Sequence, residues 1–260
     1  ISHQGRGPDQ RHRTRPRQRQ TRLRQRDDPK CCCPHRATSL SAERLMPRIA
    51  LIHATAVSMD PTETAFSKLW PEAETFHLLD SSLSTDRAKA GKLTDDLSQR
   101  IVGMANYAVE RGVDGVLYCC SAFGPAIEMA AEANSIPVLK PNEAMFESAL
   151  DIGGHLIMLV TFEGSVASME KEFEVMKETR ASDATLRSVL IDGARNAIDR
   201  GDADTHNRLI AEAAAKVGNC NAILLAHFSM DRALSAVAEA VNEPVLSPPS
   251  EAVVRLSNAL

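Results

Sequence analysis

The chain has 260 residues, of which 43% are hydrophobic and 4% aromatic. That length is enough to bury a substantial core in one large domain or two small ones. Plentiful Ala, Val, Ile and Leu with few aromatic residues favour helices packed on buried parallel strands, and so an α/β fold rather than a β-sandwich.

Charge is divided unevenly along the chain. The first 45 residues hold eleven Arg and one Lys against three Asp and one Glu, a net charge of +8, so residues 46–260 carry −12 of the total of −4. The phosphate backbone of nucleic acids rewards clustered Lys and Arg, so the acidic residues 46–260 are unsuited to it and we expect no nucleic-acid partner. Only the basic residues 1–45 could favour one. The sequence has neither a run of about 18 apolar residues nor an apolar N-terminal signal, so we expect no membrane partner and a cytoplasmic location.

Residues 1–45 are rich in Arg, Gln and Pro and show almost no apolar periodicity, which is typical of a disordered tail. This basic tail is either a functional arm or an extension without a role, because a strand pattern follows directly after Met46. Three of the six cysteines, Cys31 to Cys33, are adjacent within it. Their spacing suits neither a disulfide framework nor a tetrahedral zinc site, so we expect reduced thiols and no metal.

Apolar segments after Met46 alternate between strand and helix patterns. The predicted order is a strand at 49–52, a helix over 97–108, a strand at 115–119, a helix over 125–133 and a short strand at 136–139. Gly112 supplies a stop for the first helix, and Pro125 suits the first turn of the second. Strands that alternate with helices in this way indicate a parallel sheet.

The same pattern recurs later in the chain at one constant offset. The aligned segments are Val116–Ser121 with Ile223–Phe228, Pro137–Leu139 with Pro244–Leu246, Pro141 with Pro248, and Ile49–Ile52 with Leu156–Leu159. We therefore predict two pseudo-symmetric α/β halves, residues 47–150 and 151–255, each with a parallel sheet flanked by helices.

Ligands of open parallel sheets bind beyond the carboxyl ends of the strands, so two such halves would form a shared cleft. The constant offset pairs Cys120 with His227 across it. Backbone N–H groups and the helix that begins near Pro125 should favour a Cys120 thiolate and a bound anion. Cys119 should face the core instead, since side chains alternate along a strand. Alternatively, the duplication leaves matched loop residues that share no chemistry.

Hydroxyl side chains follow the first strand of each half. These are Thr55 and Ser58, near His53, in the first half, and Thr161 and Ser165 in the second. Hydroxyl groups suit carboxylate oxygens, so the predicted substrate-binding residues are Thr55, Ser121, Thr161 and Ser229. Helix capping is the alternative role for such residues. Three further histidines, His77, His155 and His206, are interpreted as surface or packing residues.

Three stretches, Leu117–Gly124, Ile136–Leu139 with Glu143–Met145, and Ala222–Met230, resemble the aspartate/glutamate/hydantoin racemase superfamily. The resemblance covers almost all of residues 46–260. It implies two Rossmann-like halves with an active site at their interface, and chemistry at the carbon next to a carboxylate of a small molecule. It also implies no pyridoxal phosphate, metal or other cofactor, and homodimers are common among the proteins that the chain resembles.

Racemases of this kind place one cysteine in each half, and the thiolate of one removes the proton that the thiol of the other replaces on the opposite face. The first position matches Cys120, and the second holds His227. The resemblance therefore implies a racemase or epimerase in which Cys120 and His227 form an unlike acid/base pair. The alternatives are a covalent-cysteine isomerase or decarboxylase of a small dicarboxylate, and a catalytically quiet member that binds a carboxylate.

Overall fold

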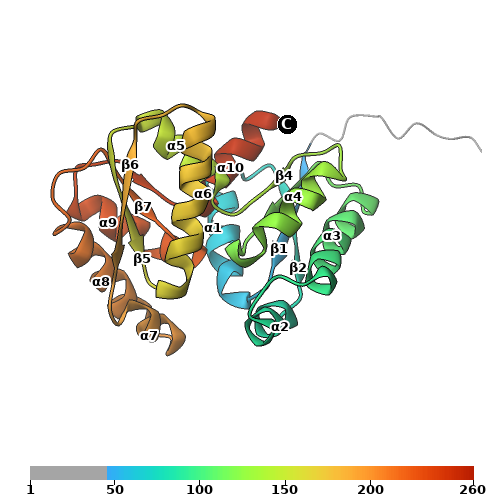
Figure 1. The fold of residues 1–260 in the computed structure, drawn as a ribbon, viewed down its shortest axis with the longest axis horizontal. Coiled ribbons are helices and arrows are strands. Elements are labelled where there is room, and N and C mark those ends of the chain that lie inside the picture. Colours follow the sequence, from blue (N-terminus) through green and yellow to red (C-terminus); the bar gives the residue numbers. More distant parts are fainter. Residues whose placement is uncertain (1–45) are drawn as a thin grey trace, which may run out of the picture. The chain divides into compact units, whose positions relative to one another are not determined.

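The computed structural model describes residues 46–260, so the predicted tail 1–45 and its cysteine cluster lie outside the described residues. Two four-stranded parallel sheets flanked by helices make up this part of the chain (Figure 1). The strand orders are β2-β1-β3-β4 and β6-β5-β7-β8. The predicted fold class is confirmed.

The strands of the first sheet are β1 (Arg48–His53), β2 (Glu74–Leu79), β3 (Gly115–Tyr118) and β4 (Val138–Leu139). Those of the second are β5 (His155–Val160), β6 (Thr185–Leu190), β7 (Ala222–Leu225) and β8 (Val245–Leu246). The α-helices are α1 (Met59–Leu69), α2 (Ser82–Ala90), α3 (Asp95–Glu110), α4 (Gly124–Glu132), α5 (Glu143–Ile152), α6 (Val166–Thr179), α7 (Ala194–Asp199), α8 (Ala203–Ala214), α9 (Leu234–Ala240) and α10 (Pro248–Ala259). Four 3₁₀ turns, η1 (Ala56–Ser58), η2 (Ser121–Phe123), η3 (Glu163–Ser165) and η4 (Phe228–Ala233), follow strands.

The repeat seen in the sequence is also the repeat of the structure. One constant offset separates the starts of β1 and β5, of β3 and β7, and of β4 and β8, and it also separates η1 from η3 and the helices that follow these turns. The predicted strands at 49–52 and 115–119 match β1 and β3. The helix expected from Pro125 begins at Gly124, after the turn η2.

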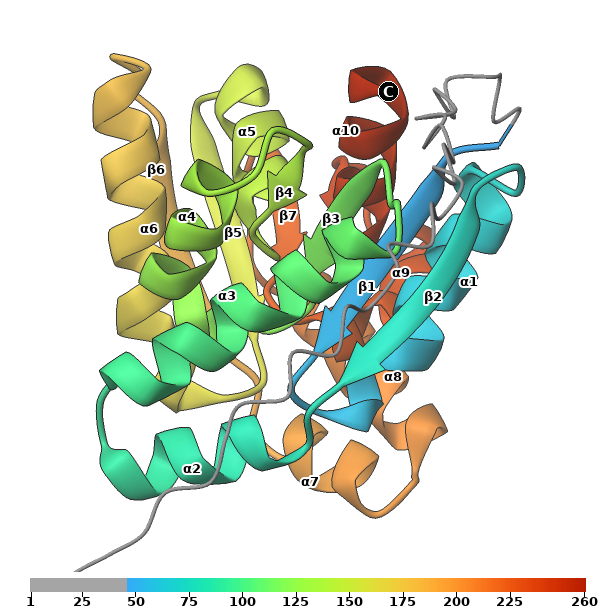
Figure 2. The same ribbon diagram turned by 90° about the vertical axis from the view of Figure 1, so that its right-hand side faces the viewer.

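Each face of the first sheet is covered by its own set of helices. Apolar side chains of α2, α3 and α4 pack on the face formed by Ala50, Ile52 and Val116. Those of α1 and α10 pack on the other face, with Ile49 and Leu51. Figure 2 shows α2 and α3 on the near side of this sheet and α1 on the far side.

Two helices pack on the sheet of the other half. Helix α5 follows β4, yet its Met145 and Phe146 belong to the core of the second sheet. Helix α10 follows β8, yet its Val253 and Leu256 belong to the core of the first. The two helices also contact each other. This exchange joins the two halves through buried apolar surface.

No helix within residues 46–260 has both the length and the apolar character that crossing a membrane requires.

Candidate functional site

The strand order of each sheet reverses at one point. From β1 the chain adds β2 on one side and then β3 on the other, and β5, β6 and β7 repeat this arrangement. Such a reversal opens a crevice at the carboxyl ends of the two central strands, where open α/β sheets bind ligands. All six predicted site residues follow these central strands: Thr55 follows β1, Cys120 and Ser121 follow β3, Thr161 follows β5, and His227 and Ser229 follow β7.

The carboxyl ends of the strands of both sheets lie on the same side of the folded residues 46–260. Helices α2 and α7, which follow β2 and β6, lie on that side in Figure 1. The turn η1 after β1 contacts the turn η4 after His227. Cys119 and Phe228, the neighbours of the paired residues, belong to one apolar cluster. The structure thus brings the loop of Thr55 against the segment that follows His227.

Cys120 is partly buried at the end of β3, directly before η2. Burial raises the pKa of its thiol, and a hydrogen bond from the backbone N–H of Ala122 opposes that rise without overcoming it. The expectation that this position favours a thiolate is therefore wrong. The physical reason is that the cost of charging a buried sulfur exceeds the gain from a single N–H donor. Near neutral pH, Cys120 is therefore protonated, as a thiol.

Cys119 occupies the opposite face of the sheet. It is 5% exposed and packs with Leu117 and Phe228, whereas Cys120 packs against the other core. Burial also raises the pKa of its thiol. The predicted packing role of Cys119 is confirmed.

His227 uses both ring nitrogens. Its Nδ1 lies 3.2 Å from Thr161 Oγ1, and its Nε2 lies 2.9 Å from Ser165 Oγ. Because the Ser165 hydroxyl donates to the Phe162 carbonyl at 2.8 Å, Ser165 accepts from Nε2–H. Nδ1 is then the unprotonated nitrogen and accepts from Thr161. Burial, followed by Arg195 and His206, lowers the pKa of His227 to about 4, so the ring is neutral near pH 7.

The first half has a buried histidine of its own. His53 ends β1, is fully buried, and also uses both ring nitrogens. Its Nδ1 lies 2.7 Å from Ser58 Oγ, and its Nε2 lies 2.9 Å from Nδ1 of His77. Burial, followed by His77, lowers the pKa of His53 to about 4. His77 was predicted to be a surface or packing residue, and its hydrogen bonds to His53 and Glu63 were missed because these partners come from two other elements.

The remaining predicted binding residues have local roles in the turns. Thr55 is partly exposed, its carbonyl accepts the Ser58 hydroxyl at 3.1 Å, and its side chain makes no cap hydrogen bond. Ser121 begins η2 and is partly exposed. The carbonyl of Ser229 accepts from Arg232 Nε at 3.0 Å. Their hydroxyl groups make no hydrogen bond within residues 46–260.

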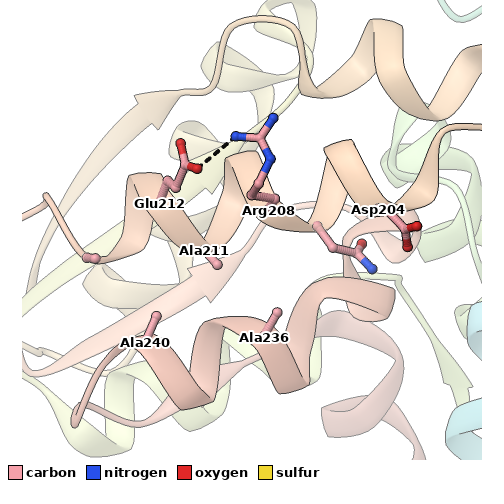
Figure 3. A pocket seen from close by; sticks show the side chains of 8 residues that line it. Asp204, Arg208, Ala211, Glu212, Ala236 and Ala240 are labelled. Atoms are coloured by element: carbon pink, nitrogen blue, oxygen red, sulfur yellow. Dashed lines mark hydrogen bonds and ion pairs between the residues drawn. The ribbon is translucent and has the colours of Figure 1, made fainter.

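Two surface hollows of the described chain share no residue with this set. The larger, of about 500 Å³, lies between α8 and α9 and is lined by four alanines and by the Arg208–Glu212 ion pair (Figure 3). The smaller, of about 330 Å³, lies beside β2 and α3. Within residues 46–260 there is no cluster of three or more His, Cys, Asp or Glu side chains that fits a metal ion.

The family model described as Asp/Glu/Hydantoin racemase matches residues 51–256. No curated protein sequence matches the chain significantly.

Several solved structures share the fold at low sequence identity. Glutamate racemase from Francisella tularensis subsp. tularensis SCHU S4 in complex with D-glutamate is 14% identical, with a TM-score of 0.57, over 82% of this chain and 80% of that one. Allantoin racemase from Klebsiella pneumoniae is 14% identical, with a TM-score of 0.60, over 82% and 86%. A glycine-to-cysteine mutant of arylmalonate decarboxylase, in a sulfate-associated form, is 20% identical, with a TM-score of 0.55, over 82% and 94%. At these identities the likeness shows the fold alone.

Proposed function

Because the chain belongs to the Asp/Glu/hydantoin racemase family, we propose that it is a cofactor-independent racemase or epimerase acting at the carbon next to the carboxylate of a small molecule. One observation carries this proposal. Cys120 and His227 occupy equivalent positions of the repeat, each just beyond the central strand that completes the strand reversal of its sheet.

Their protonation states form a complementary acid and base. Cys120 is a thiol and donates a proton, while His227 is neutral and has an unprotonated Nδ1. In the proposed reaction the Cα–H proton of the substrate passes to His227 Nδ1, and the electron pair of that bond is delocalised into the carboxylate. The Cys120 S–H bond then breaks as its proton bonds Cα from the opposite face. Cys120 is left as a thiolate and His227 as an imidazolium.

Thr161 has a defined role in this order of proton transfers. Its hydroxyl occupies Nδ1 at 3.2 Å, the longer of the two hydrogen bonds to the His227 ring. When the Thr161 hydroxyl turns to a substrate carboxylate oxygen, Nδ1 becomes free to accept the proton, while Ser165 holds Nε2. Thr161 therefore couples carboxylate binding to the release of the base. The hydroxyls of Thr55, Ser121 and Ser229 are further donors for that carboxylate.

Solvent exchange at Cα tests the proposal. The full chain is incubated in D₂O with L- and D-amino acids including glutamate, with hydantoins and with malonates, and loss of the Cα–H signal is followed by ¹H NMR. We expect exchange that Cys120→Ser slows by about 100-fold or more, as loss of a general acid does. The matched control Cys220→Ser, a partly exposed thiol that packs at the edge of the second core, leaves the rate unchanged.

The role of His227 has its own test in the same assay. The thiol and the neutral ring favour removal of the proton on the His227 face, so the two enantiomers should react with unequal initial rates. His227→Gln should slow racemisation about as strongly as Cys120→Ser. Unchanged racemisation by His227→Gln would remove His227 from the mechanism.

Decarboxylation is a second candidate, because it needs a proton donor but no partner base. The Cys120 thiol, whose pKa is raised by burial, is such a donor. Release of CO₂ from a malonate that requires Cys120 and tolerates His227→Gln would favour this reaction. A quiet binding protein would show neither exchange nor CO₂ release, while a small carboxylate would still protect Cys120 from iodoacetamide.

A further inference from the structure

A chain of four side chains joins the surface to the loop of Thr55. Glu63 Oε2 lies 3.0 Å from His77 Nε2, His77 Nδ1 lies 2.9 Å from His53 Nε2, and His53 Nδ1 lies 2.7 Å from Ser58 Oγ. The side chain of Glu63 is 49% exposed, whereas His53 and Ser58 are buried. This series of hydrogen bonds therefore starts at the solvent-exposed Glu63 and ends at Ser58, inside η1.

The second half lacks this hydrogen-bonded series, although it keeps the equivalent strand pairing and the equivalent carboxylate. His77 pairs with Leu51 across the first sheet, and Ser188 pairs with Met158, the equivalent of Leu51 in the second half. There the carboxylate of Glu170, the equivalent of Glu63, accepts the Ser188 hydroxyl at 2.7 Å. The equivalent of His53 is Val160, which has no hydrogen-bonding side chain. The second half therefore has no histidine at either of these equivalent positions.

Counting protons gives one arrangement for a charged His77. Its two N–H groups donate to Glu63 and to His53 Nε2. His53 then carries its single proton on Nδ1 and donates to Ser58 Oγ. The Ser58 hydroxyl is left to donate to the Thr55 carbonyl, which lies 3.1 Å away. Every hydrogen bond of the chain is made.

A neutral His77 gives a different arrangement. Its single proton stays on Nε2, where it faces the Glu63 carboxylate, so Nδ1 must accept. His53 then has to carry its proton on Nε2, since two unprotonated nitrogens would otherwise face each other at 2.9 Å. His53 Nδ1 becomes an acceptor, and the Ser58 hydroxyl turns to it and leaves the Thr55 carbonyl.

We propose that Glu63, His77, His53 and Ser58 form a positioning switch, in which the charge of His77 sets the tautomer of His53 and the direction of the Ser58 hydroxyl beneath Thr55. Glu63 of α1 and His53 of β1 are the titratable groups that hydrogen-bond to His77. The same elements also carry Asp60 and Lys68 of α1, and Arg48 of β1, which pairs with Glu74 at 2.9 Å. Thr75 of β2 donates to Glu63 at 3.1 Å and holds that carboxylate in place.

The change in the direction of the Ser58 hydroxyl reaches the candidate site through η1. The Thr55 carbonyl gains or loses its hydrogen bond, and η1 contacts η4, the turn that begins directly after His227. This consequence for catalysis rests on the proposed function, whereas the tautomer change in His53 does not.

Nitrogen-15 NMR of histidine-labelled full-length protein tests the switch without any activity, because ring ¹⁵N shifts distinguish protonated from unprotonated nitrogens. As the pH is raised, we expect the proton of His53 to move from Nδ1 to Nε2 with the same midpoint as the loss of charge from His77. His77→Gln identifies the signals of His77. A His53 that keeps one tautomer while His77 titrates would overturn the proposal.

Glu63→Gln keeps both histidines and provides a second measurement at a half-exposed site. Loss of the carboxylate destabilises the imidazolium, so both midpoints should fall together by about 0.5 pH unit. Glu170→Gln, the equivalent change in the second half, should leave both midpoints unmoved. A shift in His77 that His53 does not follow would also refute the coupling.

If the chain has the proposed activity, the pH dependence of KM should follow the same midpoint and shift with Glu63→Gln, while kcat at saturating substrate changes less. Unshifted KM profiles alongside coupled NMR midpoints would refute the link to catalysis and leave the tautomer switch standing.

Discussion

Two histidines, His53 at the end of β1 and His227 just after β7, are neutral near pH 7. His53 and His227 each have an ordinary pKa of 6.5 that burial lowers to about 4. A ring that is harder to protonate in the folded chain than in the unfolded chain stabilises the fold only while it is neutral. Its contribution is complete above pH 6.5 and is lost as the pH falls toward 4.

We therefore predict a specific acid sensitivity. Between pH 7 and pH 5 the free energy of unfolding should fall by about 2 kcal/mol for each of the two histidines, because the unfolded chain takes up a proton that the folded chain refuses. Urea unfolding at the two pH values measures the loss. His53→Gln and His227→Gln should each lose about 2 kcal/mol less than the parent protein over this range, because glutamine takes up no proton in either state. A variant that loses as much as the parent would show that its histidine is not the source.

Sequence reasoning reached some of these residues and missed others. Strand alternation was enough to place Cys119 and Cys120 on opposite faces of the sheet, because that rule is local. The protonation state of Cys120 was mispredicted, since it depends on how much of the molecule surrounds the sulfur. His77 was missed because its partners, Glu63 and His53, come from two other elements.

At the scale of elements, the exchanged helices are the main bridge between the halves. Leu256 of α10 is fully buried against the first sheet, near Ile49 and Leu117, although it follows the last strand of the second. The constant offset between the halves predicted the strands, because strand patterns are local. It could not predict which sheet α5 and α10 would cover, since that depends on contacts between the two halves.

Truncation of Leu256 tests that packing. Leu256→Ala should destabilise the chain by about 2–5 kcal/mol, because it removes buried methyl groups and leaves a cavity in the core of the first sheet. Val254, on the same helix, is 45% exposed, so Val254→Ala should change the stability by less than about 0.5 kcal/mol. Chemical denaturation of both variants measures the difference. Equal effects would mean that α10 does not seal the first sheet.

For the whole described chain, the exchange has a thermodynamic consequence. Unfolding the second half removes α10 from the first sheet, and unfolding the first half removes α5 from the second. Each half would then expose apolar surface that its own residues cannot cover. Neither half is therefore a complete folding unit, and residues 46–260 should unfold in one cooperative transition.

The single tryptophan makes this cooperativity measurable. Trp70 lies in the first half, packed beside Phe66 on the α1 side of the sheet. Phe173 lies in the second half, fully buried on α6, with its ring 5.6 Å from that of Phe146. Phe173→Ala should cost about 3–5 kcal/mol and lower the denaturation midpoint reported by Trp70 fluorescence by as much as the midpoint from far-ultraviolet circular dichroism. Val175→Ala, an exposed change on the same helix, should move neither. If the Trp70 midpoint stayed in place while the dichroism midpoint fell, the halves would be independent and the exchanged helices would not couple them.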